Sequence, residues 1–139
     1  MAITNPERVG RALDLLRQGL VPYVERELKA KHGDKWQVEV KRILVDRKLG
    51  TDKDDPLGDV AVLLLVMDKF WGAIFGQALS KSDRTLALEL VEVRNQWAHQ
   101  KTFSGDDTYR AVDSAFRLLS AITAPEAAEL EKIKNELLR

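Results

Sequence analysis

The strongest constraint on the fold is the spacing of apolar residues near the start of the chain. Between the Asn5-Pro6 pair and Gly33, apolar side chains recur every three or four positions, at Val9, Leu13, Leu16, Leu20, Val24 and Leu28. This spacing places them on one face of a long α-helix. Asn5 suits the helix cap, Pro6 suits the first turn and Gly33 suits the end. Pro22 predicts a kink or break, because proline lacks an N–H and its ring clashes with the preceding turn.

Helical patterns continue through most of the remaining sequence. Asp55-Pro56 predicts the start of a helix that runs to about Leu79. Its segment 60–67 is apolar on nearly every side, which is typical of a helix at the centre of a bundle. Ser82 predicts the cap of a helix that reaches about Gln100. Two capping-box pairs then predict the starts of two further helices, Ser104 with Asp107 and Thr123 with Glu126.

These segments predict an all-α protein, an antiparallel up-and-down bundle of four to five helices. The exception is the region near 34–50, where Trp36, Val38 and Val40 alternate as in a short strand. A short irregular or β-like insertion is therefore expected there. The length of 139 residues suits one domain spanning residues 1–139. The last helix reaches Arg139 without a cap, so the domain either ends there or is the N-terminal domain of a longer protein.

Composition excludes several classes of protein. The 22 basic residues balance the 22 acidic ones, so no overall field attracts nucleic acid and any RNA affinity must come from a local patch. The absence of cysteine excludes disulfides, thiolate nucleophiles and cysteine-bound metals. No apolar run approaches the ~20 residues that span a bilayer, and the N-terminus has no signal-peptide pattern. A soluble, cytoplasmic protein without a membrane partner is expected.

Two charged regions are candidate binding sites. Residues 26–48 contain eight Lys and Arg against four Asp and Glu, and are either a solvated helix face with its loop or a patch that contacts phosphate groups. The acidic stretch at 52–59 departs from a calcium loop, because Leu57 replaces the glycine and Leu63 the final glutamate. The two histidines, at 32 and 99, lack metal-ligand spacing. Neither a metal nor another cofactor is expected.

The stretch RNQWAH at 94–99 is the most unusual part of the sequence. On a helical wheel, two stripes flank Arg94. The first is the expected core stripe, with Leu86, Leu90, Val93 and Trp97; the second is a stripe of small residues, with Ala87, Val91 and Ala98. Asn95 and His99 are four positions apart and share a face, and the long side chain of Arg94 reaches toward the same opening. Three polar groups are thus expected at the rim of an apolar surface.

Each of these residues also has a purely structural interpretation. His99 suits a hydrogen-bonded position near a helix C-terminus, where a positive ring is favourable. Arg94 suits an ion pair with Asp68 or Glu92. Trp97, like Trp36 and Trp71, is expected in the core.

The functional interpretation is RNA cleavage without a metal. Arginine presents a fixed positive fork that fits a phosphate, histidine titrates near neutrality, and asparagine can orient the imidazole or hold a substrate oxygen. The 2′-hydroxyl would attack the adjacent phosphorus, with His99 as base or acid and Arg94 stabilising charge on the phosphoryl oxygens. Concerted acid–base catalysis needs two imidazoles, and two copies of the chain would supply them.

The block VRNQWAHQ at 93–100 resembles the HEPN superfamily, whose motif is an Arg, a following polar residue, and a His separated from the Arg by four to six residues. Here four residues separate Arg94 from His99. Two further blocks are similar to the Swt1-like HEPN group, PYVERELKAKHGDKW at 22–36 and SGDDTYRAVDSAFRLLSAI at 104–122. The similarity covers most of the chain.

The resemblance implies a helical bundle that dimerises, with Arg and His from both copies facing a shared cleft that cuts RNA to a 2′,3′-cyclic phosphate. By matching position, Arg94 and His99 would be catalytic and Asn95 the polar helper. It also implies a toxin or phage-defence context, with a helicase, ATPase or antitoxin partner, fused or separate.

Two hypotheses therefore stay open. The first is a metal-independent endoribonuclease acting as a homodimer. The second is a non-catalytic module that dimerises, binds RNA or docks a larger defence or helicase/ATPase protein, with an assembly surface around Ala87, Val91 and Ala98.

Overall fold

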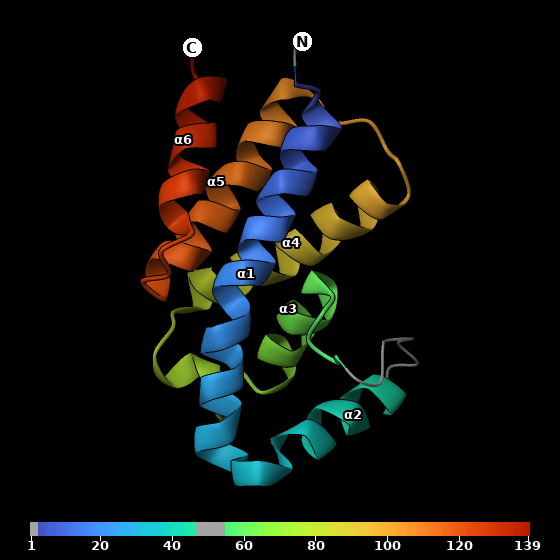
Figure 1. Cartoon of the computed structure of the whole chain (residues 1–139), viewed down its shortest axis with the longest axis vertical. Coiled ribbons are helices and arrows are strands. Elements are labelled where there is room, and N and C mark those ends of the chain that lie inside the picture. The colour runs from blue at the N-terminus through green and yellow to red at the C-terminus, as the bar shows by residue number, and fades with distance from the viewer. Residues whose placement is uncertain (1–2, 47–54) are drawn as a thin grey trace.

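The computed structural model describes residues 3–46 and 55–139, and this part of the chain is helical without a strand. The all-α prediction is confirmed. The elements in chain order are α1 (Asn5–His32), the 3₁₀ turn η1 (Gly33–Lys35), α2 (Trp36–Asp46), α3 (Val60–Lys69), the 3₁₀ turn η2 (Phe75–Gln77), α4 (Lys81–Ala98), α5 (Gly105–Ala121) and α6 (Ala127–Leu137) (Figure 1).

Helix α1 follows the predicted spacing, and all six residues of its expected apolar face are buried. The cap is Thr4, one residue earlier than predicted, and its hydroxyl accepts a hydrogen bond from the Glu7 N–H at 3.2 Å. Gly33 ends the helix with a φ of 63°, which glycine adopts without strain. The break expected at Pro22 does not occur, and α1 continues past it (Figure 1). Leu20 and Val24 are both buried, and their packing on either side of Pro22 offsets the lost backbone bond.

Helix α2 lies where an irregular or β-like insertion was expected. Trp36, Val40 and Leu44 are buried, whereas Val38 is 55% exposed. Burial at every fourth position is the helical period, so the apparent alternation of Trp36, Val38 and Val40 was misleading. The remainder of that region, 47–50, lies outside the described residues.

Helix α3 is shorter than the helix predicted from Asp55 to Leu79. It begins at Val60 because the Asp59 carboxylate accepts a hydrogen bond from the Ala61 N–H at 2.8 Å and caps the first turn. It ends at Lys69, and tight turns lead to η2. Gly76 permits those turns, because a Cβ there would lie 2.8 Å from the Trp71 carbonyl oxygen.

Caps explain the remaining helix boundaries. α4 is capped by Ser80 rather than by Ser82, through a reciprocal capping box with Asp83. Ser104 caps α5 as predicted, accepting a hydrogen bond from the Asp107 N–H at 3.0 Å. The box predicted at Thr123 is absent from the described structure, since Thr123 has a φ of 57° and Glu126 occupies the cap position of α6.

The helices run both parallel and antiparallel to one another (Figure 1). α5 and α6 are antiparallel, and the Lys134 ammonium lies 2.9 Å from the Asp113 carboxylate between them. α1 and α5 start side by side, because the Asn5 amide donates to the Phe103 carbonyl at 2.9 Å. Further along both helices, Gly19 faces the Leu119 side chain, so α1 and α5 run in the same direction.

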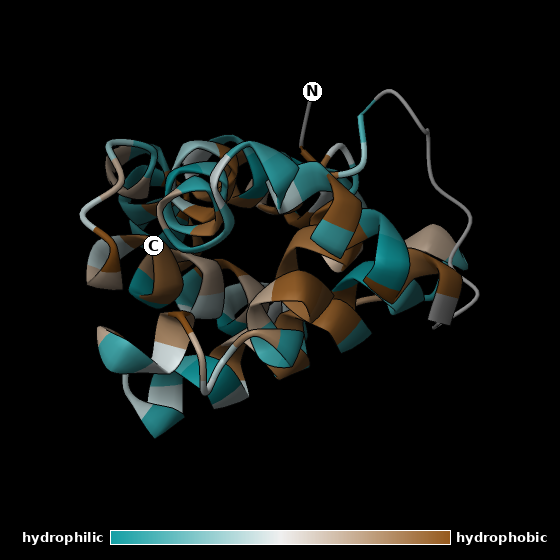
Figure 2. Ribbon diagram, turned by 90° about the horizontal axis from the view of Figure 1, so that it is seen from below, coloured by the Kyte–Doolittle hydropathy of each residue, from teal (hydrophilic) through white to brown (hydrophobic). Residues whose placement is uncertain are grey.

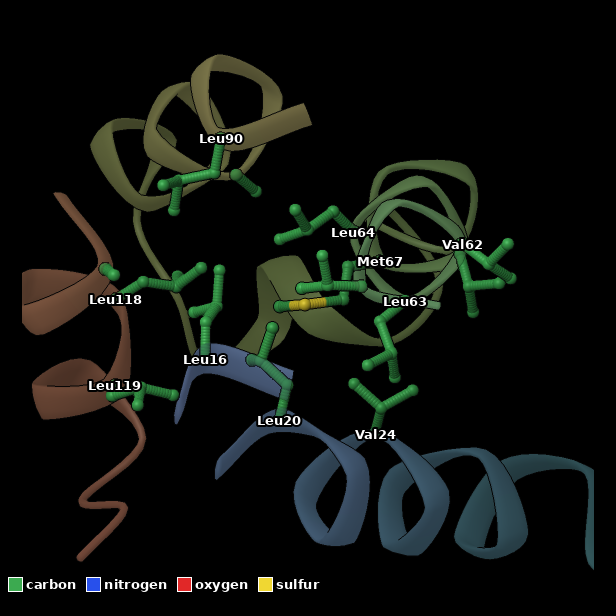
Figure 3. Close-up of a cluster of buried hydrophobic side chains, with 14 of the residues drawn as sticks. Leu16, Leu20, Val24, Val62, Leu63, Leu64, Met67, Leu90, Leu118 and Leu119 are labelled. Carbon is green, nitrogen blue, oxygen red and sulfur yellow. The ribbon is translucent and has the colours of Figure 1, made fainter. Parts of the chain in front are cut away.

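The core lies where α1, α3, α4 and α5 meet. In Figure 3 Leu16, Met67, Leu90 and Leu118 point toward one another from these four helices. Val62 lies on the opposite side of α3 and is also buried, as expected for a central helix. Figure 2 shows the resulting division of the helices into apolar and polar faces.

Helices α3 and α4 are antiparallel and are joined by an ion pair near each end. Arg84 near the start of α4 donates to Asp68 near the end of α3, at 2.8 Å. Arg94 near the end of α4 donates to Asp59 at the start of α3, at 2.6 Å. The second pair involves the predicted site arginine and places it relative to the bundle. No helix among the described residues is both long and apolar enough to cross a membrane.

Candidate functional site

The site lies at the C-terminal end of α4, which carries the RNQWAH stretch away from the core. Ala87 and Leu90 are buried, but residues 91 to 102, all of which the structure describes, include none that is buried. The assembly surface expected around Ala87, Val91 and Ala98 is therefore only partly available. Ala87 is enclosed by the bundle, Val91 is partly buried, and Ala98 is exposed.

Arg94 is held by an ion pair, but its partner is neither Asp68 nor Glu92. One terminal nitrogen, Nη2, donates to Oδ2 of Asp59 at 2.6 Å, while Oδ1 of the same carboxylate caps α3. Asp59 thus connects the first turn of α3 to the guanidinium of Arg94. Both side chains are about two-thirds buried, so the pair positions the guanidinium more firmly than a fully solvated pair would.

Asn95 contacts Arg94 and not the ring of His99. Its side-chain oxygen accepts a long hydrogen bond of 3.4 Å from Nη1 of Arg94. Its backbone oxygen accepts the His99 N–H at 3.1 Å. The Asn95 side chain therefore supports the arginine. Among the described residues, no contact of this side chain supports its expected role in orienting the imidazole of His99.

His99 is the C-cap residue of α4, and its side chain is exposed. The helix ends in a Schellman motif, in which Gln100 N–H bonds to the Trp97 oxygen and Lys101 N–H to the Gln96 oxygen, both at 3.0 Å. Gln100 adopts a φ of 58° to make this turn. The imidazole has no hydrogen bond or ion pair among the described residues. It is thus free to exchange a proton with a bound molecule.

Trp97 is 43% exposed, so its expected place in the core is wrong. Its indole Nε1 donates to the Pro6 carbonyl oxygen at 3.1 Å. The ring also lies against Gly10, where a Cβ would come within 3.0 Å of Nε1. Because the end of α4 extends past the core, the stripe predicted from helical periodicity leaves the core before it reaches Trp97.

A cleft of about 560 Å³ opens beside Arg94, between α1, the segment before α3, and α4. Its lining includes Gly10, Leu13, Asp14, Arg17, Asp55, Gly58, Asp59, Val60, Arg94 and Trp97. His99 does not line this cleft, since five residues correspond to a rotation of roughly 140° around the helix from Arg94. Arg94, Asn95 and Asp59 are brought together, and His99 is presented to a different side.

Sequence reasoning missed Asp59 as the partner of Arg94. The available signal was an aspartate immediately before the apolar run that starts at Val60, which is a typical helix cap. The capping role could have been predicted from this position. The ion pair could not, because it depends on the antiparallel packing of α3 and α4.

The described part of the chain contains no group of three or more His, Asp or Glu side chains that could hold a metal ion. Residues 52–54 of the acidic stretch lie outside it. In the locally basic region, Arg26, Lys29 and Arg42 each pair with a glutamate on the same helix. These pairs favour the interpretation as a solvated helix face.

The chain matches a known protein family. A family model described as Swt1-like HEPN matches residues 11–123, which is more than half of the chain and includes Asp59, Arg94, Asn95 and His99. Neither the curated proteins nor the solved structures gave a match.

Proposed function

Because the chain belongs to the Swt1-like HEPN family, we propose that it is a metal-independent endoribonuclease whose active site forms where two copies of the chain meet. Membership of this family supports an RNA-related or nuclease role in general terms. The specific proposal rests on the surroundings of two side chains at the C-terminal end of α4. Arg94 is positioned beside a cleft, and His99 offers an exposed, unpartnered imidazole.

Arg94 is suited to stabilise charge on a phosphate. A guanidinium has five N–H donors, and the contacts to Asp59 and Asn95 use only two of them. The remaining donors can bind the non-bridging oxygens of a phosphodiester. Because the group is already oriented, binding does not require the arginine side chain to be ordered at that moment.

His99 is suited to move protons. In the proposed step one imidazole takes the proton of the 2′-hydroxyl as the O2′–P bond forms. A second, protonated imidazole gives its proton to O5′ as the P–O5′ bond breaks. The products are a 2′,3′-cyclic phosphate and a 5′-hydroxyl, and the atoms balance without a water molecule.

A second copy of the chain supplies what one copy lacks. One chain offers a single imidazole at the end of α4, on a different side from its own Arg94 cleft. The exposed end of α4, with Ala98 and His99, is the surface proposed for pairing the two copies. A C₂ arrangement would face each His99 toward the other copy.

The alternative is a non-catalytic interaction module, and one observation favours it. The cleft beside Arg94 carries three carboxylates, Asp14, Asp55 and Asp59, against two guanidinium groups, Arg17 and Arg94. With a net charge of zero, the chain has little electrostatic attraction for RNA on its own. In either role, a toxin or phage-defence setting and a helicase, ATPase or antitoxin partner are part of the proposal.

The decisive experiment is cleavage of single-stranded RNA in the presence of EDTA, with analysis of the product ends. Wild type should produce 2′,3′-cyclic phosphate ends, and His99→Ala and Arg94→Ala should each lower the rate at least ~10²-fold. The matched control is Arg84→Ala, which removes an arginine of the same helix that also pairs with an aspartate of α3. It should keep the cleavage rate.

Equal cleavage by wild type and both site variants would indicate a contaminating nuclease and refute the proposal. A dimer that binds RNA but does not cut it would favour the interaction module. Circular dichroism of each variant checks that the fold is retained.

A further inference from the structure

The indole of Trp97 is an exposed aromatic surface that the proposed chemistry does not use. We infer that Trp97 is the stacking platform for an unpaired base of the RNA, which places the adjoining phosphodiester beside Arg94 of the same chain. The inference rests on the proposed function, because it names the part of the substrate that the same site recognises.

The ring is fixed before any ligand arrives. The hydrogen bond from Nε1 to the Pro6 oxygen, at 3.1 Å, sets its orientation. Gly10 has no side chain, and its Cβ position lies 3.0 to 3.2 Å from three atoms of the indole, so the ring packs directly on the backbone of α1. Trp97 as a whole is nevertheless 43% exposed. A surface residue held in one orientation loses little conformational entropy when a ligand stacks on it.

Trp97 also lies between two hollows. One is the 560 Å³ cleft that contains Arg94 and Arg17. The other is a hollow of about 350 Å³, lined by Pro6, Trp97, Ala98, Gln100 and Lys101. The ring therefore stands at the boundary between the side of α4 that carries Arg94 and the turn that follows His99.

The position along the helix fits a nucleotide. Trp97 follows Arg94 by three residues, so their side chains are neighbours on the helix surface. His99 follows Trp97 by two residues, a rotation of roughly 200° around the helix, so the two side chains lie on different sides. A base stacked on the indole therefore keeps its own sugar and phosphate beside Arg94, and the imidazole would come from the second copy of the chain.

The chemistry of the lining suits a base better than an apolar protein segment. Asp14, Asp59, Arg17 and Arg94 line the larger cleft together with Trp97. A nucleobase combines a flat apolar face with polar edges, so it can stack on the indole while its edge meets charged groups. The base must be unpaired, because bases in a duplex already stack on each other.

The test is binding of a single-stranded 2′-O-methyl RNA of mixed sequence, which cannot be cut because its 2′-oxygens are blocked. Trp36 and Trp71 are buried, so base stacking should quench the emission of Trp97 selectively. Trp97→Leu should weaken the Kd by about tenfold or more, and Trp97→Tyr should restore most of the affinity by supplying another aromatic face. The same strand annealed to its complement should bind poorly.

Two further variants serve as controls. Leu88→Ala removes an apolar side chain of the same helix that is 41% exposed and lies outside the cleft, and it should bind as wild type does. Gly10→Ala inserts a Cβ beneath the indole and should weaken binding by displacing the ring, while replacing none of the side chains that line the cleft. If Trp97→Leu fails to fold, Gly10→Ala still tests whether the indole binds the base.

Unquenched emission of wild type in the presence of the single strand would overturn the inference. So would an unchanged Kd for Trp97→Leu. Conversion of a dimer to a monomer by Trp97→Leu, without quenching in wild type, would assign the ring to protein contact instead. Quenching and tight binding together with uncut natural RNA would refute the ribonuclease proposal and leave this inference standing. Cleavage by wild type with unchanged binding by Trp97→Leu would refute the inference alone.

Discussion

An arginine–aspartate ion pair joins α3 and α4 at each end of this helix pair, but the two ion pairs have different surroundings. At one end Arg84 pairs with Asp68 at 2.8 Å, and its guanidinium also lies over the Trp71 ring at 5.9 Å from the ring centroid. At the other end Arg94 pairs with Asp59 at 2.6 Å and faces a cleft of about 560 Å³.

The difference lies in what remains available to a ligand. Asp68 is the more enclosed carboxylate, at 16% exposure against 36% for Asp59, and an aromatic ring covers one face of Arg84. That end joins two helices, and neither Arg84 nor Asp68 lines the 560 Å³ cleft. At the Arg94 end, an equivalent ion pair leaves donors directed toward open space. The Arg84–Asp68 pair thus only holds two helices together, whereas the Arg94–Asp59 pair also positions a guanidinium beside a cleft.

The largest expected effect comes from the residue that lies between the two ends. Leu90 is buried in the core (Figure 3), and Leu90→Ala should lower the free energy of unfolding by about 2–5 kcal/mol through lost contacts and a cavity. Denaturant unfolding measures the change. Leu88→Ala, two positions away and 41% exposed, is the control and should cost no more than about 0.5 kcal/mol. Similar losses for both variants would mean that α4 does not pack through Leu90.

An intermediate effect is expected at the carboxylate that holds Arg94. Asp59→Asn keeps a good helix cap but removes the charge, so the free energy of unfolding should fall by at most about 1 kcal/mol. Cleavage should fall by more than this stability change alone would cause, about tenfold, because the guanidinium is no longer oriented. Rates under conditions where both proteins are fully folded measure the effect.

The matched variant at the other end is Asp68→Asn. It should lower stability by a similar amount and leave cleavage unchanged, because neither Asp68 nor Arg84 lines the cleft beside Arg94. Faster cleavage by Asp59→Asn would contradict the supporting role and show that Asp59 competes with the phosphate for Arg94.

The smallest effect is expected in the turn after His99. Gln100 has a φ of 58°, a conformation that costs an L-residue with a side chain roughly 1 kcal/mol. Gln100→Gly should raise the free energy of unfolding by about 0.5 kcal/mol, after allowance for the flexibility of glycine in the unfolded chain. Gly33→Ala is the opposite change at a φ of 63° with open space around it, and it should destabilise. Thermal unfolding of both variants tests the pair.

Most of the fold follows from local sequence patterns. The face of α1 and the cap of α5 were predictable because each depends on residues within a few positions. The strand-like segment predicted near Val38 was wrong, because a stretch this short fits both the period of a strand and the period of a helix. The helix break predicted at Pro22 does not occur, because packing on both sides of the proline outweighs the loss of one backbone hydrogen bond.

Candidate residues for the site could be chosen from the sequence, but their arrangement in space could not. Spacing and resemblance pointed to Arg94, Asn95 and His99. The pairing of Arg94 with Asp59 joins residues 35 positions apart and depends on how two helices pack. The exposure of Trp97 likewise depends on where the core ends, which helical periodicity does not encode.

Because the RNQWAH stretch lies beyond the buried part of α4, its exposed residues can be replaced during evolution at little cost to the stability of the fold. Substitutions that remove a buried group are opposed by the stability of the fold, but the His99 side chain is exposed, so its replacement meets little such opposition. A descendant of this chain can lose His99, and with it the proposed cleavage, through one change and still fold. Active and inactive copies of such a domain can therefore diverge without passing through an unstable intermediate.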